Sequence, residues 1–167
     1  MHWEYLEEIG KVTAHSETPL KLEKELYRRV LTDAGPKLEK VGVGEQGAAG
    51  DFPSVKVGDE LVCRVVLRTD RDMEYVHLKD YRGSGTEPVD VLSGYKFQDG
   101  LFYYQSTRDT ATHFFIDYLR RGTYVFEYNL RVQHSGEYPM GYAAIECMYA
   151  PEFRSHSAGI TLRVSAK

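Results

Sequence analysis

The stretch Gly122–His134, GTYVFEYNLRVQH, decides the fold. Along it, aromatic or aliphatic residues occupy every second position, and most of the residues between them are polar or charged. A period of two is typical of a strand with one face in a core and the other in solvent. The stretch therefore predicts a long, half-buried β-strand whose inward residues are Tyr124, Phe126, Tyr128, Leu130 and Val132.

The approach to this strand indicates the architecture. Leu119, Gly122 and Tyr124 have the spacing of a tyrosine corner, in which the tyrosine hydroxyl donates a hydrogen bond back to the loop before the strand. Gly122 allows the tight approach that this bond needs. Because tyrosine corners occur in immunoglobulin-like sandwiches, we expect an all-β, antiparallel immunoglobulin/fibronectin-like β-sandwich and structural roles for these three residues.

Further segments alternate in the same way. DELVCRVVLRTD and MEYVHLKD flank the turn TDRD, and we expect a β-hairpin from residues 59–70 and 73–80. QDG is a turn signal before LFYYQST, which is joined by RDT to ATHFFIDYL in a second expected hairpin. Two more strands are expected in GYAAIECMYA and AGITLRVSA, residues 141–150 and 158–166.

The first 54 residues follow a different pattern and are expected to form an N-terminal extension, with residues 55–167 as the sandwich domain. TPLKLEKELYRRV and PKLEKV flank the turn TDAGP and predict a charged hairpin, which would protect a sheet edge from aggregation. HWEYLEEIGKV is expected to be a short helix or a linker. GVGEQGAAGDFP, residues 42–53, is expected to be a glycine- and alanine-rich loop.

Composition excludes several classes of partner. The chain has 167 residues and a net charge of -4, so it lacks the basic face that nucleic acid requires, and we expect no nucleic-acid partner. It has no apolar run of about 18 residues, so we expect no membrane insertion by this segment. The first residues show no secretory signal pattern. Cys63 and Cys147 lie within apolar alternation and are expected to be separate buried thiols.

No combination of residues predicts catalysis or metal binding. The sequence contains no nucleophile elbow, no phosphate-binding glycine loop and no zinc-binding histidine motif. His77 and His113 are expected at the solvent face or at the edge of the core. We therefore expect no enzyme activity, no metal and no cofactor.

Two segments have both a structural and a binding interpretation. Tyr95, Phe97, Phe102, Tyr103 and Tyr104 either fill the core and cover the sheet, or form a platform for sugar or protein. In CMYAPEFRSHSAG, residues 147–159, a strand ends in Met148 and Tyr149, and a polar loop is expected before the last strand. That pair either packs at the end of the sandwich or presents a compact apolar tip to another molecule.

Three stretches together resemble a known family. DRDMEYVHLKDYRGSGTEPV, residues 70–89, resembles a strand-and-loop segment of bacterial alpha-2-macroglobulins. Residues 119–159 resemble the end of the same domain, with Gly-x-Tyr, an alternating strand and then Met-Tyr-x-Pro-Glu. The intervening SGYKFQDGLFYYQSTRD looks like members from Bacteroidetes-type bacteria. The likeness spans roughly residues 55–167.

The resemblance implies a non-catalytic C-terminal macroglobulin domain of a secreted or periplasmic protease trap. Its partners would be the other domains of the parent chain and, indirectly, target proteases. In members that carry a thioester, the resemblance implies that Met148 and Tyr149 shield it from water. Pro151 would fix the loop, and Glu152 would hold it by hydrogen bonds. The alternative is an extracytoplasmic glycan- or protein-binding module that uses residues 95–104.

Overall fold

The computed structural model describes residues 12–15, 17–41 and 54–166. These residues contain fourteen strands and no helix, so the all-β prediction is confirmed. The segment expected as a helix or linker before residue 12 and the loop expected at residues 42–53 lie outside the described ranges.

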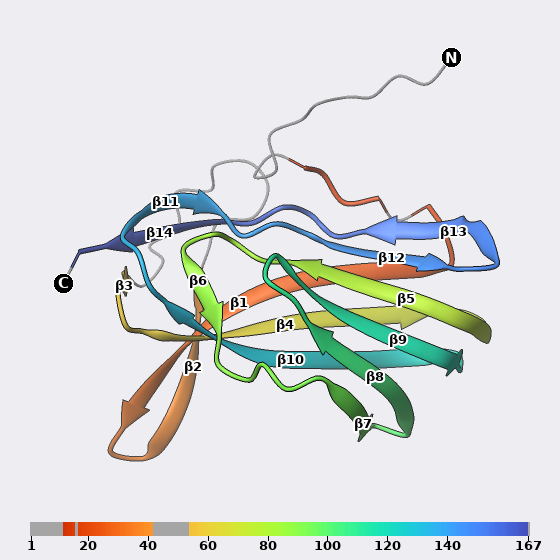
Figure 1. Ribbon diagram of the computed structural model, residues 1–167, viewed down its shortest axis with the longest axis horizontal. Coiled ribbons are helices and arrows are strands. Elements are labelled where there is room, and N and C mark those ends of the chain that lie inside the picture. The colour runs from red at the N-terminus through yellow and green to blue at the C-terminus, as the bar shows by residue number, and fades with distance from the viewer. Residues whose placement is uncertain (1–11, 16, 42–53, 167) are drawn as a thin grey trace.

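The strands form three sheets (Figure 1). The five-stranded sheet has the order β2-β1-β4-β10-β6: Gly35–Val41, Leu20–Thr32, Glu60–Thr69, Gly122–Val132 and Thr86–Pro88. The six-stranded sheet has the order β13-β12-β5-β9-β8-β7: Ala150–His156, Ala143–Cys147, Met73–Tyr81, Ala111–Leu119, Leu101–Thr107 and Gly94–Gln98. The three-stranded sheet has the order β11-β14-β3: Gly136–Pro139, Thr161–Ser165 and Val55–Lys56. Only the β14–β3 pair is parallel among the described strands.

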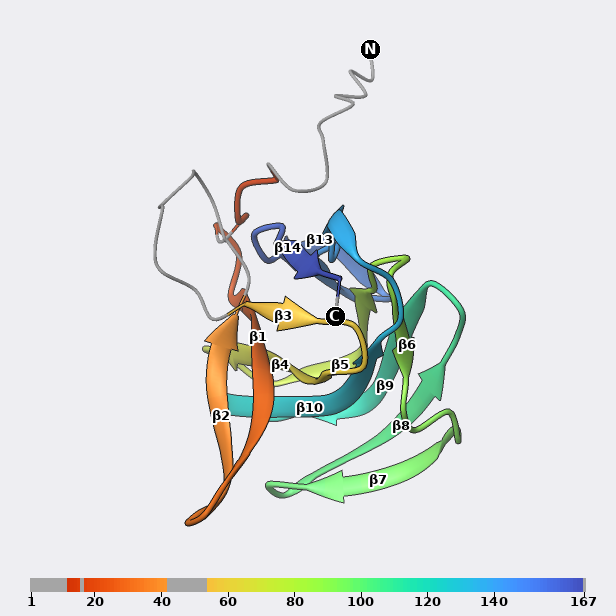
Figure 2. The same ribbon diagram turned by 90° about the vertical axis from the view of Figure 1, so that its left-hand side faces the viewer.

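The two larger sheets pack face to face, and the three-stranded sheet lies at the end where the C-terminus leaves (Figures 1 and 2). Phe126 of β10 meets Phe114 of β9 with ring centroids 4.9 Å apart and Tyr103 of β8 at 5.2 Å. Every second residue of β4, from Leu61 to Leu67, is also buried in this core. The predicted sandwich and its inward faces are therefore confirmed.

The expected hairpin of β4 and β5 is wrong. β4 pairs with β1 on one side and β10 on the other, whereas β5 pairs with β12 and β9 in the opposite sheet. Because both edges of β4 are occupied, the turn at residues 70–72 carries the chain across the core instead of folding it back alongside. Alternation shows which residues face the core, but it does not show which strand is the neighbour.

The charged hairpin expected near the N-terminus is present as β1 and β2. The two strands pair from Leu26 opposite Val41 to Thr32 opposite Gly35, and β2 is an edge strand. β1, however, lies between β2 and β4, and the side chains of Leu20 and Leu26 are buried. The hairpin expected within residues 1–54 is thus built into the sandwich through its first strand.

The start of β10 has the geometry of a tyrosine corner. The hydroxyl of Tyr124 donates a hydrogen bond to the carbonyl oxygen of Arg120 at 2.9 Å. Leu119 is fully buried, and Gly122 has a φ of +156°. The corner therefore fixes the turn between β9 and β10 from inside the sandwich.

Residues 12–15 form a strap against the end of β13 and the residues that follow it. The N–H of His15 donates to the carbonyl oxygen of His156 at 3.0 Å, and the N–H of Gly159 donates to that of Val12 at 2.9 Å. The Ser155 hydroxyl also donates to the carbonyl oxygen of His15. The chain then continues into β1, so the strap crosses from one large sheet to the other.

Candidate functional site

The hairpin of β12 and β13 ends in a two-residue turn made by Met148 and Tyr149, which we name the tip turn. Both side chains are exposed, Met148 by 55% and Tyr149 by 79%, and together they form an apolar pair at the end of the hairpin. The expected polar loop after Pro151 is wrong, because residues 150–156 form β13 and pair with β12. The strand accommodates these polar residues because β13 is an edge strand of the six-stranded sheet, in which only Ser155 is buried.

Tyr75 at the start of β5 holds the tip turn in place. Its carbonyl oxygen accepts a hydrogen bond from the N–H of Met148 at 2.9 Å. Its ring meets that of Tyr149 edge to face, with centroids 5.1 Å apart and an angle of 86°. Tyr75 itself has a φ of +53°, a left-handed conformation that costs a non-glycine residue about 1–3 kcal/mol. Such local strain is found mainly where the fold must direct a side chain, and here it directs an aromatic ring to the tip.

Asp72 and Tyr118 form the side of the tip. The Tyr118 hydroxyl donates to Asp72 Oδ2 at 2.8 Å, and the N–H of Arg121 donates to Asp72 Oδ1 at 2.7 Å. The backbone bond from Arg121 and then the Tyr118 hydroxyl lower the pKa of Asp72, and the same contact raises the pKa of Tyr118. A shallow hollow of about 620 Å³ lies between this side and Tyr149. The tip is therefore a rigid, partly aromatic surface.

Pro151 and Glu152 are the second and third residues of β13, and both are exposed. Within the described part of the chain, the Glu152 side chain makes no hydrogen bond or ion pair. The hydrogen bonds expected to hold the turn come from the backbone of Met148 instead.

The aromatic stretch at residues 95–104 divides between the core and the surface. Tyr103 is buried, whereas Tyr95, Phe97 and Phe102 are more than half exposed. The Tyr95 and Phe102 rings stack with centroids 5.1 Å apart and an angle of 11°. The core interpretation thus holds for Tyr103, and the platform interpretation stays a prediction for Tyr95, Phe97 and Phe102.

His77 and His113 lie on the outer face of the six-stranded sheet, as expected, but they also contact each other. His77 Nε2 and His113 Nδ1 are 2.9 Å apart, and both rings stack on Phe115. Burial lowers the pKa of both imidazoles, and for His113 the proximity of His77 adds to the effect. The sequence did not predict this pair, because it depends on β5 and β9 being neighbours.

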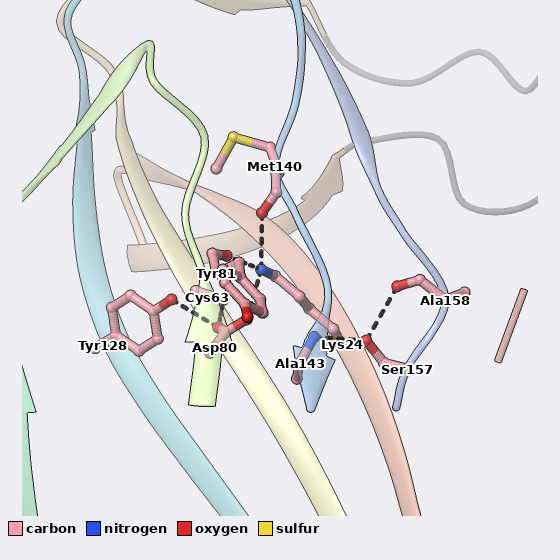
Figure 3. A network of polar contacts seen from close by, with 9 residues as sticks. All are labelled: Lys24, Cys63, Asp80, Tyr81, Tyr128, Met140, Ala143, Ser157 and Ala158. Atoms are coloured by element: carbon pink, nitrogen blue, oxygen red, sulfur yellow. Dashed lines mark hydrogen bonds and ion pairs between the residues drawn. The ribbon is translucent and has the colours of Figure 1, made fainter. Parts of the chain in front are cut away.

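A buried ion pair joins the two large sheets (Figure 3). Lys24 Nζ of β1 lies 2.6 Å from Asp80 Oδ1 of β5, and their side chains are 1% and 0% exposed. The ammonium group also donates to the carbonyl oxygens of Tyr81 at 2.6 Å and Met140 at 2.9 Å. All three ammonium donors are therefore satisfied.

The other carboxylate oxygen of Asp80 is satisfied as well. Tyr128 donates its hydroxyl to Asp80 Oδ2 at 2.6 Å, and Cys63 donates its thiol at 3.1 Å. Burial raises the pKa of both donors, and the negative charge of Asp80 raises them further, so both keep their protons. Because a protonated, enclosed thiol is a poor nucleophile, this network has a structural role. Cys63 and Cys147 are both free and buried, as expected.

The sequence analysis missed this pair, although the sequence contains a signal for it. Lys24 shares its face of β1 with Leu22 and Leu26, and Asp80 shares its face of β5 with Leu78. Two charges of opposite sign at inward positions of alternating strands predict a buried pair, since neither could be buried alone.

No group of three or more potential metal ligands occurs among residues 12–15, 17–41 and 54–166. These residues also contain no helix that is long and apolar enough to cross a membrane.

Comparison with known proteins identifies what the chain is similar to. The family described as Bacterial Alpha-2-macroglobulin MG10 domain matches residues 20–152. The crystal structure of a tyrosine-to-glycine mutant of Salmonella alpha-2-macroglobulin has a TM-score of 0.64 and 16% identity, over 93% of this chain and 10% of that chain. Native Escherichia coli alpha-2-macroglobulin from domain MG7 to the C-terminus has a TM-score of 0.62 and 15% identity, over 89% of this chain and 24% of that chain.

One curated relative is the circularly permutated Ras protein 2 of Dictyostelium discoideum. It is 30% identical over 98 residues, which is 59% of this chain and 2% of that protein. The chain thus spans only a small part of the proteins that it matches. The Bacteroidetes type stays a prediction, because the matches named here come from other organisms.

Proposed function

Because the chain belongs to the bacterial alpha-2-macroglobulin MG10 domain family, we propose that it is a non-catalytic interaction domain of an alpha-2-macroglobulin-like protease trap. The tip turn docks on a neighbouring domain of the same protein, restrains the resting state and is released when a protease cuts the trap. Its partners are the other domains of the longer chain and, indirectly, the target proteases. The protein acts in the periplasm or at the cell surface.

The exposure of the tip turn is the observation that carries this proposal. The side chains of Met148 and Tyr149 project from a tight hairpin, and the ring of Tyr75, which has a left-handed backbone conformation, contacts the ring of Tyr149. Burying a side chain of this size stabilises a complex by roughly 1.5–3 kcal/mol. The side chains of Met148 and Tyr149 together can therefore hold a contact between domains that is still weak enough to be released after a protease cuts the trap. Where the longer protein carries a thioester, the same cap excludes water from it, with Met148 and Tyr149 in contact and Pro151 and Glu152 at the base.

The solved structures of related proteins suggest the assay. They include Salmonella alpha-2-macroglobulin reacted with methylamine and Escherichia coli alpha-2-macroglobulin activated by trypsin. In the full-length protein, we expect Tyr149→Ala to increase the rate of methylamine incorporation, or of the conformational change induced by trypsin, by about tenfold or more, which corresponds to about 1.4 kcal/mol of lost contact.

Tyr95→Ala is the matched control, because Tyr95 is another exposed tyrosine on a hairpin of the same sheet but far from the tip in sequence. It should leave both rates unchanged. Equal rates for wild type and Tyr149→Ala, with equal stability of the two proteins, would refute docking through the tip turn.

A second candidate function rests on the stacked, exposed rings of Tyr95 and Phe102. Phe97, which pairs with Phe102 across the hairpin, is also exposed, and the three rings form an aromatic patch on an edge hairpin, of the kind that contacts a sugar or a protein surface. Under this alternative, Tyr95→Ala and not Tyr149→Ala would weaken the interaction, so the same two variants distinguish the two functions.

A further inference from the structure

The outer face of the six-stranded sheet contains a hollow centred on Ala144, which we name the Ala144 hollow. In the middle row of this face, Lys79 of β5 and His156 of β13 flank Ala144 of β12. The next row on this face consists of larger side chains: Glu146 of β12 lies between His77 of β5 and Arg154 of β13. A single small residue surrounded by large ones leaves a cavity of about 640 Å³, within the range of small-molecule sites.

Aromatic rings form a continuous wall of the hollow. The Tyr81 ring lies 5.1 Å from the Tyr142 ring, which lies 5.7 Å from the ring of His156. His156 in turn stacks on His15 of the N-terminal strap at 5.8 Å. Such a wall offers several ring faces to the C–H groups of a flat or chair-shaped ligand.

The charges around the hollow favour an anion. The ammonium group of Lys79 lies over the Tyr81 ring at 4.3 Å, and neither Lys79 nor Arg154 forms an ion pair with a described carboxylate. Glu146 is the one carboxylate among the described lining residues. The two cations are thus available, and an arginine can hold a carboxylate through two parallel hydrogen bonds.

Glu146 narrows the class of ligand. A carboxylate repels a ligand that carries many negative charges, but it accepts hydrogen bonds from hydroxyl groups. A ligand that suits the whole lining therefore has one anionic group for Lys79 and Arg154, hydroxyl donors for Glu146, and a ring for the aromatic wall.

We propose that the Ala144 hollow binds a sugar ring that bears a carboxylate, as in the uronic acid units of acidic polysaccharides. The carboxylate lies between Lys79 and Arg154, and the ring lies over Ala144 against Tyr142. This site is separate from the tip turn and does not depend on the docking function.

An NMR titration of the isotope-labelled chain tests the proposal. Sodium glucuronate should produce saturable shifts in the backbone amides of Ala144 and Tyr142, with a dissociation constant in the roughly millimolar range that suits one monosaccharide. Glucose, which lacks the carboxylate, should bind at least about tenfold more weakly, and acetate, which lacks the ring, should give no saturable shift at these amides.

Variants distinguish the hollow from general surface binding. Ala144→Leu fills the hollow and Lys79→Met removes one cation, so each should weaken glucuronate binding by about tenfold or more. Lys37→Met, which removes an exposed lysine on β2, and Tyr149→Ala at the tip turn should leave it unchanged. The proposal is refuted if glucuronate at tens of millimolar gives no saturable shift, or if glucose binds as tightly as glucuronate. It is also refuted if the Lys79→Met variant binds glucuronate as tightly as the wild type.

Discussion

The buried pair of Lys24 and Asp80 gives the sharpest test of how this sandwich is held together. Replacing Lys24 by Met keeps the length of the side chain but leaves the carboxylate of Asp80 enclosed without a counter-charge. Removing one partner of a buried ion pair costs about 3–5 kcal/mol, because the other charge stays desolvated. Since the total free energy of unfolding of a domain is about 5–15 kcal/mol, the variant should lose a large part of its stability.

The double variant Lys24→Met/Asp80→Leu should cost much less than the two single changes added together. It leaves no unpaired charge. The groups that lose a partner are the carbonyl oxygens of Tyr81 and Met140, the hydroxyl of Tyr128 and the weakly donating thiol of Cys63. Each of these neutral groups costs about 1–3 kcal/mol when buried alone. We expect the coupling free energy between the two sites to be at least about 2 kcal/mol.

Urea unfolding followed by far-ultraviolet circular dichroism measures all four free energies of unfolding. The pair of Arg68 and Glu23 is the matched control: it links β4 to β1 at 3.0 Å, but both side chains are more than half exposed. The same cycle there, with Arg68→Met and Glu23→Gln, should give about 0–1 kcal/mol. If Lys24→Met costs less than about 1 kcal/mol, or if the double variant costs as much as the sum of the single variants, the argument from burial is wrong.

Two further predictions concern pH and one glycine. Because burial lowers the pKa of His77 and His113 below 6.5 in the fold, the unfolded chain binds more protons below that pH. Stability to urea should therefore be fully present above pH 6.5 and fall as the pH drops below it. The double variant His77→Gln/His113→Gln should flatten this pH dependence, whereas the control His134→Gln should leave it unchanged. Gly141 has a φ of +73°, and a Cβ added there would lie 2.6 Å from the Cβ of Tyr81. Gly141→Ala should therefore lower the melting temperature and reduce the free energy of unfolding by about 1–3 kcal/mol. Gly94→Ala, where an added Cβ meets nothing within 4 Å, should change the melting temperature little, and equal effects of the two alanines would contradict the steric argument.

For the long alternating strands, the residues that face the core could be predicted from the sequence, because the period of two is a local property. The polar strand β13 lacks this signal and was expected to be a loop. The buried residues of β10 and β4 follow directly from it. The turn at QDG was also predictable, since Asp99 and Gly100 both have positive φ, at 52° and 78°, and this residue pair tolerates such a conformation.

The partner of each strand was not predictable in the same way. β4 and β5 are adjacent in sequence and carry compatible patterns, yet they lie in opposite sheets, because pairing depends on strands that are far away in the chain. The contact of His77 with His113 and the Ala144 hollow depend on that long-range pairing, so local patterns could not show them. Met148 and Tyr149 could be singled out because the pair ends a predicted strand and fits the Met-Tyr-x-Pro-Glu pattern of the family, and their docking role stays a prediction.

The strap of residues 12–15 has a consequence for how this domain can be truncated. The family match begins at Leu20, which makes that residue an attractive start for a shorter protein. Such a protein would lose the bonds that the strap makes to Ser155, His156 and Gly159, and would leave the last residues of the edge strand β13 without a partner on that side. An open edge recruits strands from other copies, so the shorter protein would oligomerise or aggregate although its sandwich core is complete. In this fold, the few residues before the first strand thus protect one end of an edge strand that the family match alone would leave uncovered.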